Sequence, residues 1–110
     1  MVGSLLPIVV SHGEGRVDAD EDRLARLREA GLTALAFTDH QRAPTTRYPM
    51  NPNGSPGGLT AVTSDDGRAL AMMPHPERAF RSIQWSWRPD GLGEYSPWFA
   101  LFLSAAKQFN

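Results

Sequence analysis

Apolar residues in this chain are gathered into short runs separated by polar stretches rich in glycine and proline. The run at 5–10 is apolar and β-branched, which predicts a buried strand. Similar runs at 32–37, 59–64 and 68–73 predict further strands. Between the last two stands Asp65-Asp66-Gly67, and its Asp-Gly pair is typical of a tight β-turn. The last two runs are therefore expected to form a hairpin.

Two other segments have apolar residues at helical spacing. Acidic residues lead into 21–30, and Gly31 follows, so this segment has the charge order and the glycine end expected of a helix. Ser96 and Pro97 suit the N-cap and the first position of a second helix. The aromatic and aliphatic stripe over 98–106 then predicts a face packed in the core.

The order strand, helix, strand, hairpin, helix predicts an α/β fold with some antiparallel pairing. A length of 110 residues is that of a single domain, residues 1–110. The segments between the predicted elements, 38–58 and 78–95, are rich in turn-forming residues and are expected to be loops.

Composition excludes several classes of protein. Lys and Arg number 11 against 12 Asp and Glu, a net charge of −1, so no nucleic-acid footprint is present. No apolar run approaches the ~18 residues of a membrane span, and the N-terminus lacks the basic region of a signal peptide. We therefore expect a soluble, cytoplasmic protein. The chain has no cysteine, which excludes disulfides, thiolate metal sites and a cysteine nucleophile within it.

The sharpest chemical motif is Pro74-His75-Pro76-Glu77, which follows a predicted strand. In an extended chain residues i and i+2 point to the same side, so Glu77 is placed to orient the His75 ring. A carboxylate on one ring nitrogen leaves the other free as a base. The alternative is an ordinary loop with a surface histidine.

A second His-x-Glu pair lies in the glycine-rich stretch 11–16, at His12 and Glu14, followed by Arg16. A tight turn with incidental polar side chains explains this stretch equally well. Together with His75 and Glu77, these two residues could form a metal site, although their spacing does not specify one.

A serine nucleophile is also conceivable, at Ser11 or Ser55. The sequence around Ser55, Asn53-Gly54-Ser55-Pro56-Gly57, lacks the first glycine of a nucleophile elbow and no helical segment follows it. We interpret it as a plain loop.

Four segments taken together resemble one enzyme family. The chain is similar to the C-terminal end of the large, single-chain phosphoribosylformylglycinamidine synthases, within the class I glutamine amidotransferases. The resemblance runs from about Leu6 onward and rests on the segments 11–16, 48–56, 71–81 and 93–98.

This resemblance implies the C-terminal portion of a flavodoxin-like glutaminase domain, in which a cysteine on an elbow attacks the side-chain amide of glutamine. It gives His75 the role of base toward the cysteine and acid toward ammonia, with Glu77 orienting it. The ammonia would pass to a synthetase domain that uses ATP and Mg²⁺ to convert formylglycinamide ribonucleotide to the amidine. A place near the cleft or a domain interface is expected for His12, Glu14, Arg16, Asn51, Asn53 and Ser55.

The elbow, the oxyanion loop and the synthetase domain have no counterpart in these residues. We therefore expect a fragment of the synthase that is inactive alone, with glutamine as substrate and the rest of the synthase as partner. The alternative from another class is a non-catalytic interaction or complementing module. A slice of parallel sheet would also expose an edge and an apolar face, which predicts an oligomer or a marginally folded monomer.

Overall fold

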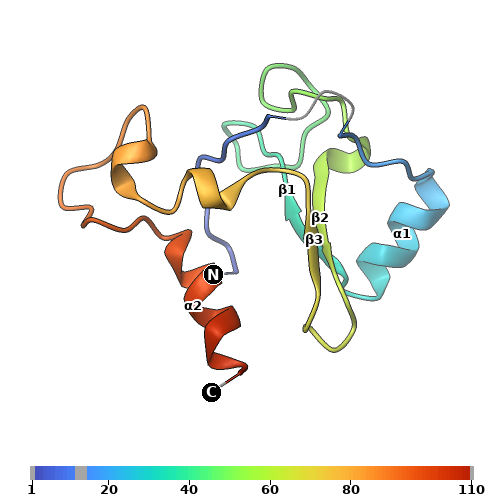
Figure 1. Ribbon diagram of the computed structural model, residues 1–110. Coiled ribbons are helices and arrows are strands. Elements are labelled where there is room, and N and C mark those ends of the chain that lie inside the picture. Colours follow the sequence, from blue (N-terminus) through green and yellow to red (C-terminus); the bar gives the residue numbers. More distant parts are fainter. Residues whose placement is uncertain (1, 12–14, 110) are drawn as a thin grey trace. The chain divides into compact units, whose positions relative to one another are not determined.

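The computed structural model describes residues 2–11 and 15–109 (Figure 1). Its chain divides into two compact units. One unit combines the N-terminal segment, up to Ser11, with the chain from His75 onward. The other consists of the chain between them, up to Pro74.

The unit that ends at Pro74 is built on a three-stranded sheet in the order β1-β2-β3, in which both strand pairs are antiparallel. The predicted hairpin and the strand before it are therefore confirmed. The expected slice of parallel sheet is wrong for these strands, because a loop without a crossover helix returns the chain from β1 to β2. The strands are β1 (Thr33–Ala36), β2 (Leu59–Thr63) and β3 (Leu70–Met72).

The β2–β3 turn is closed by its own side chains. The Ser64 hydroxyl donates to Asp66 Oδ1 at 2.6 Å, and the backbone N–H of Arg68 donates to the same oxygen at 3.0 Å. Gly67 takes a positive φ of 70°, a conformation that glycine adopts without steric cost. Both hydrogen bonds hold the pKa of Asp66 below its ordinary value, and the bond from Ser64 is the larger cause.

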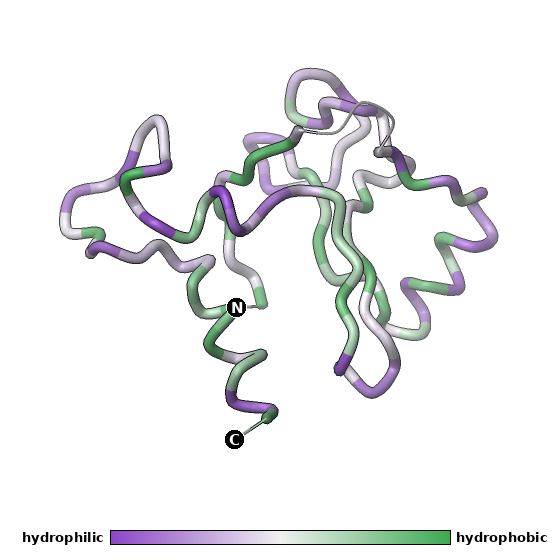
Figure 2. The backbone as a smooth tube through the Cα atoms, in the orientation of Figure 1, coloured by the Kyte–Doolittle hydropathy of each residue, from purple (hydrophilic) through white to green (hydrophobic). Residues whose placement is uncertain are grey.

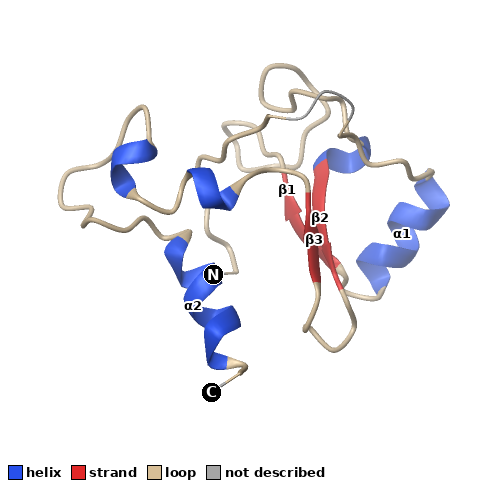
Figure 3. Cartoon of the chain, in the orientation of Figure 1, coloured by secondary structure: helices blue, strands red, loops and turns tan. Residues whose placement is uncertain are grey.

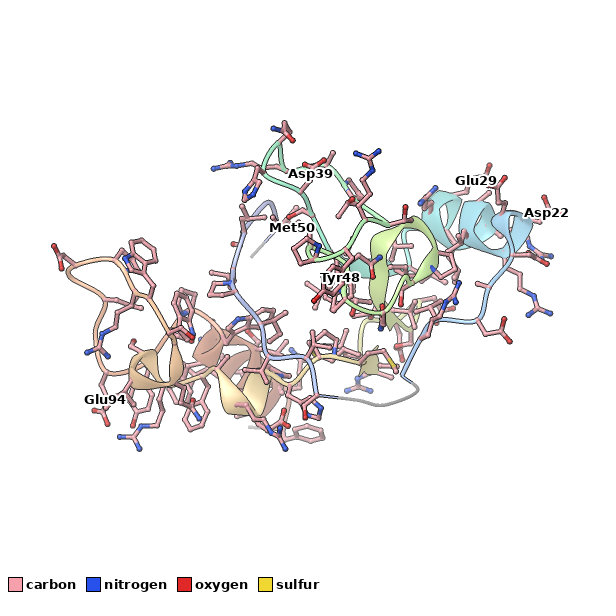
Figure 4. All side chains as sticks on the ribbon, turned by 90° about the horizontal axis from the view of Figure 1, so that it is seen from above. Asp22, Glu29, Asp39, Tyr48, Met50 and Glu94 are labelled. Carbon is pink, nitrogen blue, oxygen red and sulfur yellow. The ribbon has the colours of Figure 1, made fainter. Side chains whose placement is uncertain are left out.

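Helix α1 (Glu21–Glu29) confirms the predicted helix. Asp20 caps it by accepting a hydrogen bond from the Arg23 N–H at 2.8 Å, and the chain leaves it through Gly31, at a φ of 70°. Leu24 is its buried residue. Asp22 and Glu29 are exposed, and their side chains point away from the helix into solvent (Figure 4).

The predicted strand at 5–10 is wrong. The segment makes one isolated antiparallel bridge, between Val9 and His75, and forms no ladder. Pro7 has no N–H to donate, which removes one hydrogen bond that a strand would need here.

The other unit, which combines the N-terminal segment with the chain from His75 onward, contains two short 3-10 turns and one α-helix (Figure 3). These are the turns Pro76–Arg78 and Ser82–Gln84 and helix α2 (Phe99–Lys107). The second predicted helix is thus confirmed, but it begins later than Ser96-Pro97. The Phe99 N–H bonds the Ser96 carbonyl at 3.0 Å, a three-residue spacing, so a tighter turn precedes the α-helix.

The apolar stripe of α2 is not packed in a core. None of the α2 residues is buried, and its apolar character is visible along most of its length (Figure 2). Phe102 and Leu103 keep 39% and 47% of their surface exposed. Phe99 does stack on Tyr95, with ring centroids 4.3 Å apart, but of the predicted stripe only Trp98 is buried.

Among the described residues, no helix combines the length and the apolar character needed to cross a membrane.

Candidate active site

His75 stands just beyond the hairpin, at the start of a 3-10 turn. Its backbone N–H donates to the Val9 carbonyl at 2.9 Å. Pro74 and Pro76, on either side, are buried, whereas the His75 side chain is 29% exposed. The two prolines restrict the backbone on both sides and bury their rings. The imidazole is therefore left at the surface on a fixed piece of chain.

The expected contact between His75 and Glu77 is present, with Nδ1 and Oε1 separated by 2.6 Å. Its geometric origin differs from the prediction, which assumed an extended chain. His75 has a φ of −111° and ψ of 87°, and Glu77 is the middle residue of the 3-10 turn Pro76–Arg78. The turn closes through a hydrogen bond from the Arg78 N–H to the His75 carbonyl at 3.1 Å.

The electrostatics of this pair fix the direction of its hydrogen bond. The bond from His75 is the main cause that holds the pKa of Glu77 below its ordinary value, so Glu77 is a carboxylate at neutral pH. A carboxylate only accepts hydrogen bonds, and Nδ1 must therefore carry the proton and donate it. In the neutral ring, Nε2 then holds the free lone pair and can act as a base.

The end of the turn is held by two side chains, those of Trp85 and Ser96, for which the sequence pattern predicts no role at this site. The Ala79 carbonyl accepts hydrogen bonds from Trp85 Nε1, at 2.9 Å, and from the Ser96 hydroxyl. Trp98 Nε1 donates to the Pro7 carbonyl at 2.7 Å. The only available signal was that a buried indole or hydroxyl requires a partner, and the sequence does not say which one.

Asn51, Asn53 and Ser55 come together in the other unit, in the loop that leads to β2. The Asn51 amide donates to the Thr45 and Ser55 carbonyls, at 2.9 and 3.0 Å. The Ser55 hydroxyl donates to Asn53 Oδ1 at 2.8 Å and accepts from the Val17 N–H at 3.3 Å. Asn53 also donates to the Gly15 carbonyl. These side chains hold the loop together, and their expected place near a cleft stays a prediction.

Ser55 is fully buried, at 0% exposure, so its hydroxyl is closed to a substrate. The reading as a serine nucleophile at this position is therefore wrong. Ser11 and Arg16 are both exposed.

His12 and Glu14 lie outside the described residues, and so does half of the metal site considered with His75 and Glu77. Within residues 2–11 and 15–109, no three His, Cys, Asp or Glu residues cluster as metal ligands would.

Comparison with known protein families matches residues 1–109 to the CobB/CobQ-like glutamine amidotransferase domain. The chain belongs to this family. The match spans both units, so the His75–Glu77 turn and the sheet both lie within the glutamine amidotransferase domain. A glutamine-dependent family is also consistent with the small α/β architecture, with its three-stranded sheet and two helices.

Proposed function

We propose that this chain supplies the histidine–glutamate pair of a glutaminase centre whose cysteine nucleophile comes from outside these 110 residues. The observation that carries the proposal is the 2.6 Å contact between His75 Nδ1 and Glu77 Oε1, which leaves Nε2 as the basic nitrogen. Membership of the glutamine amidotransferase family supplies the substrate class. The chain has no cysteine, so it has no nucleophile of its own for this chemistry.

In the proposed reaction His75 moves protons and Glu77 holds the ring. Nε2 takes the thiol proton, and the resulting thiolate attacks the side-chain carbonyl carbon of glutamine. The protonated Nε2 then gives its proton to the departing amide nitrogen, so that ammonia leaves and a thioester forms. Water, activated by the same nitrogen, then attacks the thioester, the C–S bond breaks to give glutamate, and the departing thiolate takes the proton back from Nε2. Throughout, the Glu77 carboxylate favours the imidazolium that forms in each step.

The finer proposal is that the ammonia serves phosphoribosylformylglycinamidine synthase, in which it converts formylglycinamide ribonucleotide to the amidine. The four sequence segments that resemble this synthase support it. The same resemblance assigns ATP and Mg²⁺ to a synthetase part outside these residues. The partners of the chain are then glutamine and the rest of the synthase.

Reconstitution tests the proposal. The chain is mixed with a separately produced, cysteine-bearing glutaminase segment of a single-chain synthase, and release of glutamate from glutamine is measured. We expect activity in the mixture and none from the chain alone. His75→Ala should remove it, whereas His40→Ala, which changes an exposed histidine of the other unit, should not.

The outcomes separate the rival functions. Association without glutamate release would favour a non-catalytic interaction module. A second mixture also contains the synthetase part. If it releases glutamate but does not amidate formylglycinamide ribonucleotide with ATP, the proposed glutaminase activity stands and the proposed role in the synthase is contradicted.

A further inference from the structure

The turn that carries His75 and Glu77 is held at both ends by one short segment, residues 95–98. The two anchoring side chains in this segment, those of Ser96 and Trp98, are 3% and 6% exposed. Neither side chain is hydrogen-bonded to His75 or Glu77. Ser96 instead donates to the backbone carbonyl of Ala79, and Trp98 donates to that of Pro7.

At the first end, Trp98 acts through the N-terminal segment. Its indole N–H donates to the Pro7 carbonyl at 2.7 Å, and two residues further along, the Val9 carbonyl accepts the His75 N–H at 2.9 Å. Val9 makes a single bridge and no strand ladder. The segment that carries Val9 therefore depends on the Trp98 hydrogen bond rather than on a sheet for its position.

At the other end, Ser96 fixes the residue that closes the turn. Its hydroxyl donates to the Ala79 carbonyl, and its backbone N–H donates to the Phe80 carbonyl at 2.7 Å. Ala79 is 2% exposed and caps the turn Pro76–Arg78 through a hydrogen bond to the Pro76 carbonyl. Trp85 shares the Ala79 carbonyl and strengthens this end.

A rigid support is needed because the pair itself is exposed. Glu77 keeps 57% of its side-chain surface in solvent, and an exposed ion pair gains little free energy against the entropy of holding two side chains together. A turn whose backbone is already fixed removes part of that entropic cost. The contact then persists for as long as the two anchors keep the turn in place.

We propose that Ser96 and Trp98 are positioning residues for the His75–Glu77 pair. They act through Ala79 and through the segment 7–9, and the catalytic meaning of this role rests on the proposed function. Their effect on the geometry of the pair does not depend on that function.

The first test is made on the whole chain by NMR. Trp98→Phe keeps an aromatic ring and removes the indole donor, and Ser96→Ala removes the hydroxyl. In each variant we expect the Glu77 carboxyl, followed by ¹³C shifts, to titrate closer to its ordinary pKa. The ¹⁵N shifts of the His75 ring should lose their preference for the Nδ1–H tautomer. Trp87→Phe is the matched control, because Trp87 is exposed and bonds neither end of the turn.

Ser96→Thr provides a rescue, since it restores a hydroxyl, and its titration should return toward that of the wild type. This pair of Ser96 variants decides the matter even where Trp98→Phe does not fold. If a folded Ser96→Ala variant leaves the titration of Glu77 and the tautomer of His75 as they are in the wild type, the proposal is wrong.

The second test uses the reconstituted glutaminase. We expect Ser96→Ala to lower kcat on the order of tenfold to a hundredfold, with little change in the KM for glutamine. A fall in melting temperature with unchanged kcat would assign Ser96 a structural role only and overturn the proposal. An inactive mixture in which the NMR changes still occur would contradict the proposed function and leave the positioning role intact.

Discussion

The polar side chains of this chain have two different roles, and the degree of burial separates them. Asn51 is 1% exposed and directs both its donor and its acceptor groups into the loop around it. His75 and Glu77 bond each other through Nδ1 of the ring, and both side chains remain partly exposed. A buried amide must satisfy its hydrogen bonds internally, whereas a reactive imidazole must keep one nitrogen unoccupied.

The lowered pKa of Glu77 predicts how stability depends on pH. Its pKa lies below the ordinary value of 4.5 in the folded state. The contribution of the His75–Glu77 contact to the free energy of unfolding is therefore fully present above pH 4.5. It is lost as the pH falls through the pKa of Glu77 in the folded state. We expect Glu77→Gln to flatten the acid limb of a plot of unfolding free energy against pH, measured by urea denaturation.

His75→Ala is the companion variant for this prediction, because it keeps the carboxylate and removes its main partner. Its acid limb should resemble that of Glu77→Gln. An acid limb as steep as that of the wild type in both variants would contradict the assigned cause of the shift.

At the level of the elements, the start of β2 requires a glycine at position 58. Gly58 has a φ of 71°, and a Cβ there would lie 2.8 Å from the Phe37 carbonyl oxygen and 3.0 Å from that of Thr45. Both contacts are with backbone, which cannot move without disturbing the way the loop meets β1 and β2. The hydrogen bond from the Phe37 N–H to the Gly58 carbonyl, at 2.8 Å, ties these segments together.

Gly58→Ala is therefore expected to destabilise the fold by about 2–5 kcal/mol, as left-handed strain adds to overpacking. Gly54→Ala is the control, because Gly54 has a φ of 69° and its Cβ would meet nothing within 4 Å. It should cost only about 1–2 kcal/mol. Chemical denaturation of both variants measures the difference, and equal losses would show that the backbone clash is unimportant.

For the molecule as a whole, the main liability is apolar surface that the chain does not cover. The unit that combines the N-terminal segment with the chain from His75 onward exposes several large apolar side chains. They include Ile83 and Trp87 in a loop and Phe102 and Leu103 on α2. Among its described apolar residues, only Pro76, Ala79 and Trp98 are buried. A small unit with so few buried side chains is marginally stable, and its exposed patches favour association.

We therefore expect the purified chain either to associate with rising concentration or to melt broadly as a monomer. Sedimentation velocity and a thermal melt followed by circular dichroism measure the two behaviours. Replacing both Phe102 and Leu103 by serine should reduce association without changing the signal of the sheet in the other unit. A sharp, cooperative melt from a strict monomer would contradict the expectation.

The sequence by itself determined the elements whose signals are local. The Asp-Gly turn, the capped helix α1, the apolar strands of the hairpin and the His-x-Glu spacing each depend on residues within a few positions. Propensity, turn geometry and capping act over such distances, and the structure has each of these features. The resemblance of four segments likewise indicated a glutamine amidotransferase, which the family match confirms.

Only the tertiary structure decided what depends on residues far apart in the chain. The segment at 5–10 has the composition of a strand, yet among the described residues it makes only one isolated bridge, from Val9 to His75. Trp98 and Pro7 are 91 positions apart, and no local pattern connects an indole with a distant carbonyl. The pairing of β1 with β2 and the support of the His75–Glu77 turn follow from such long-range contacts.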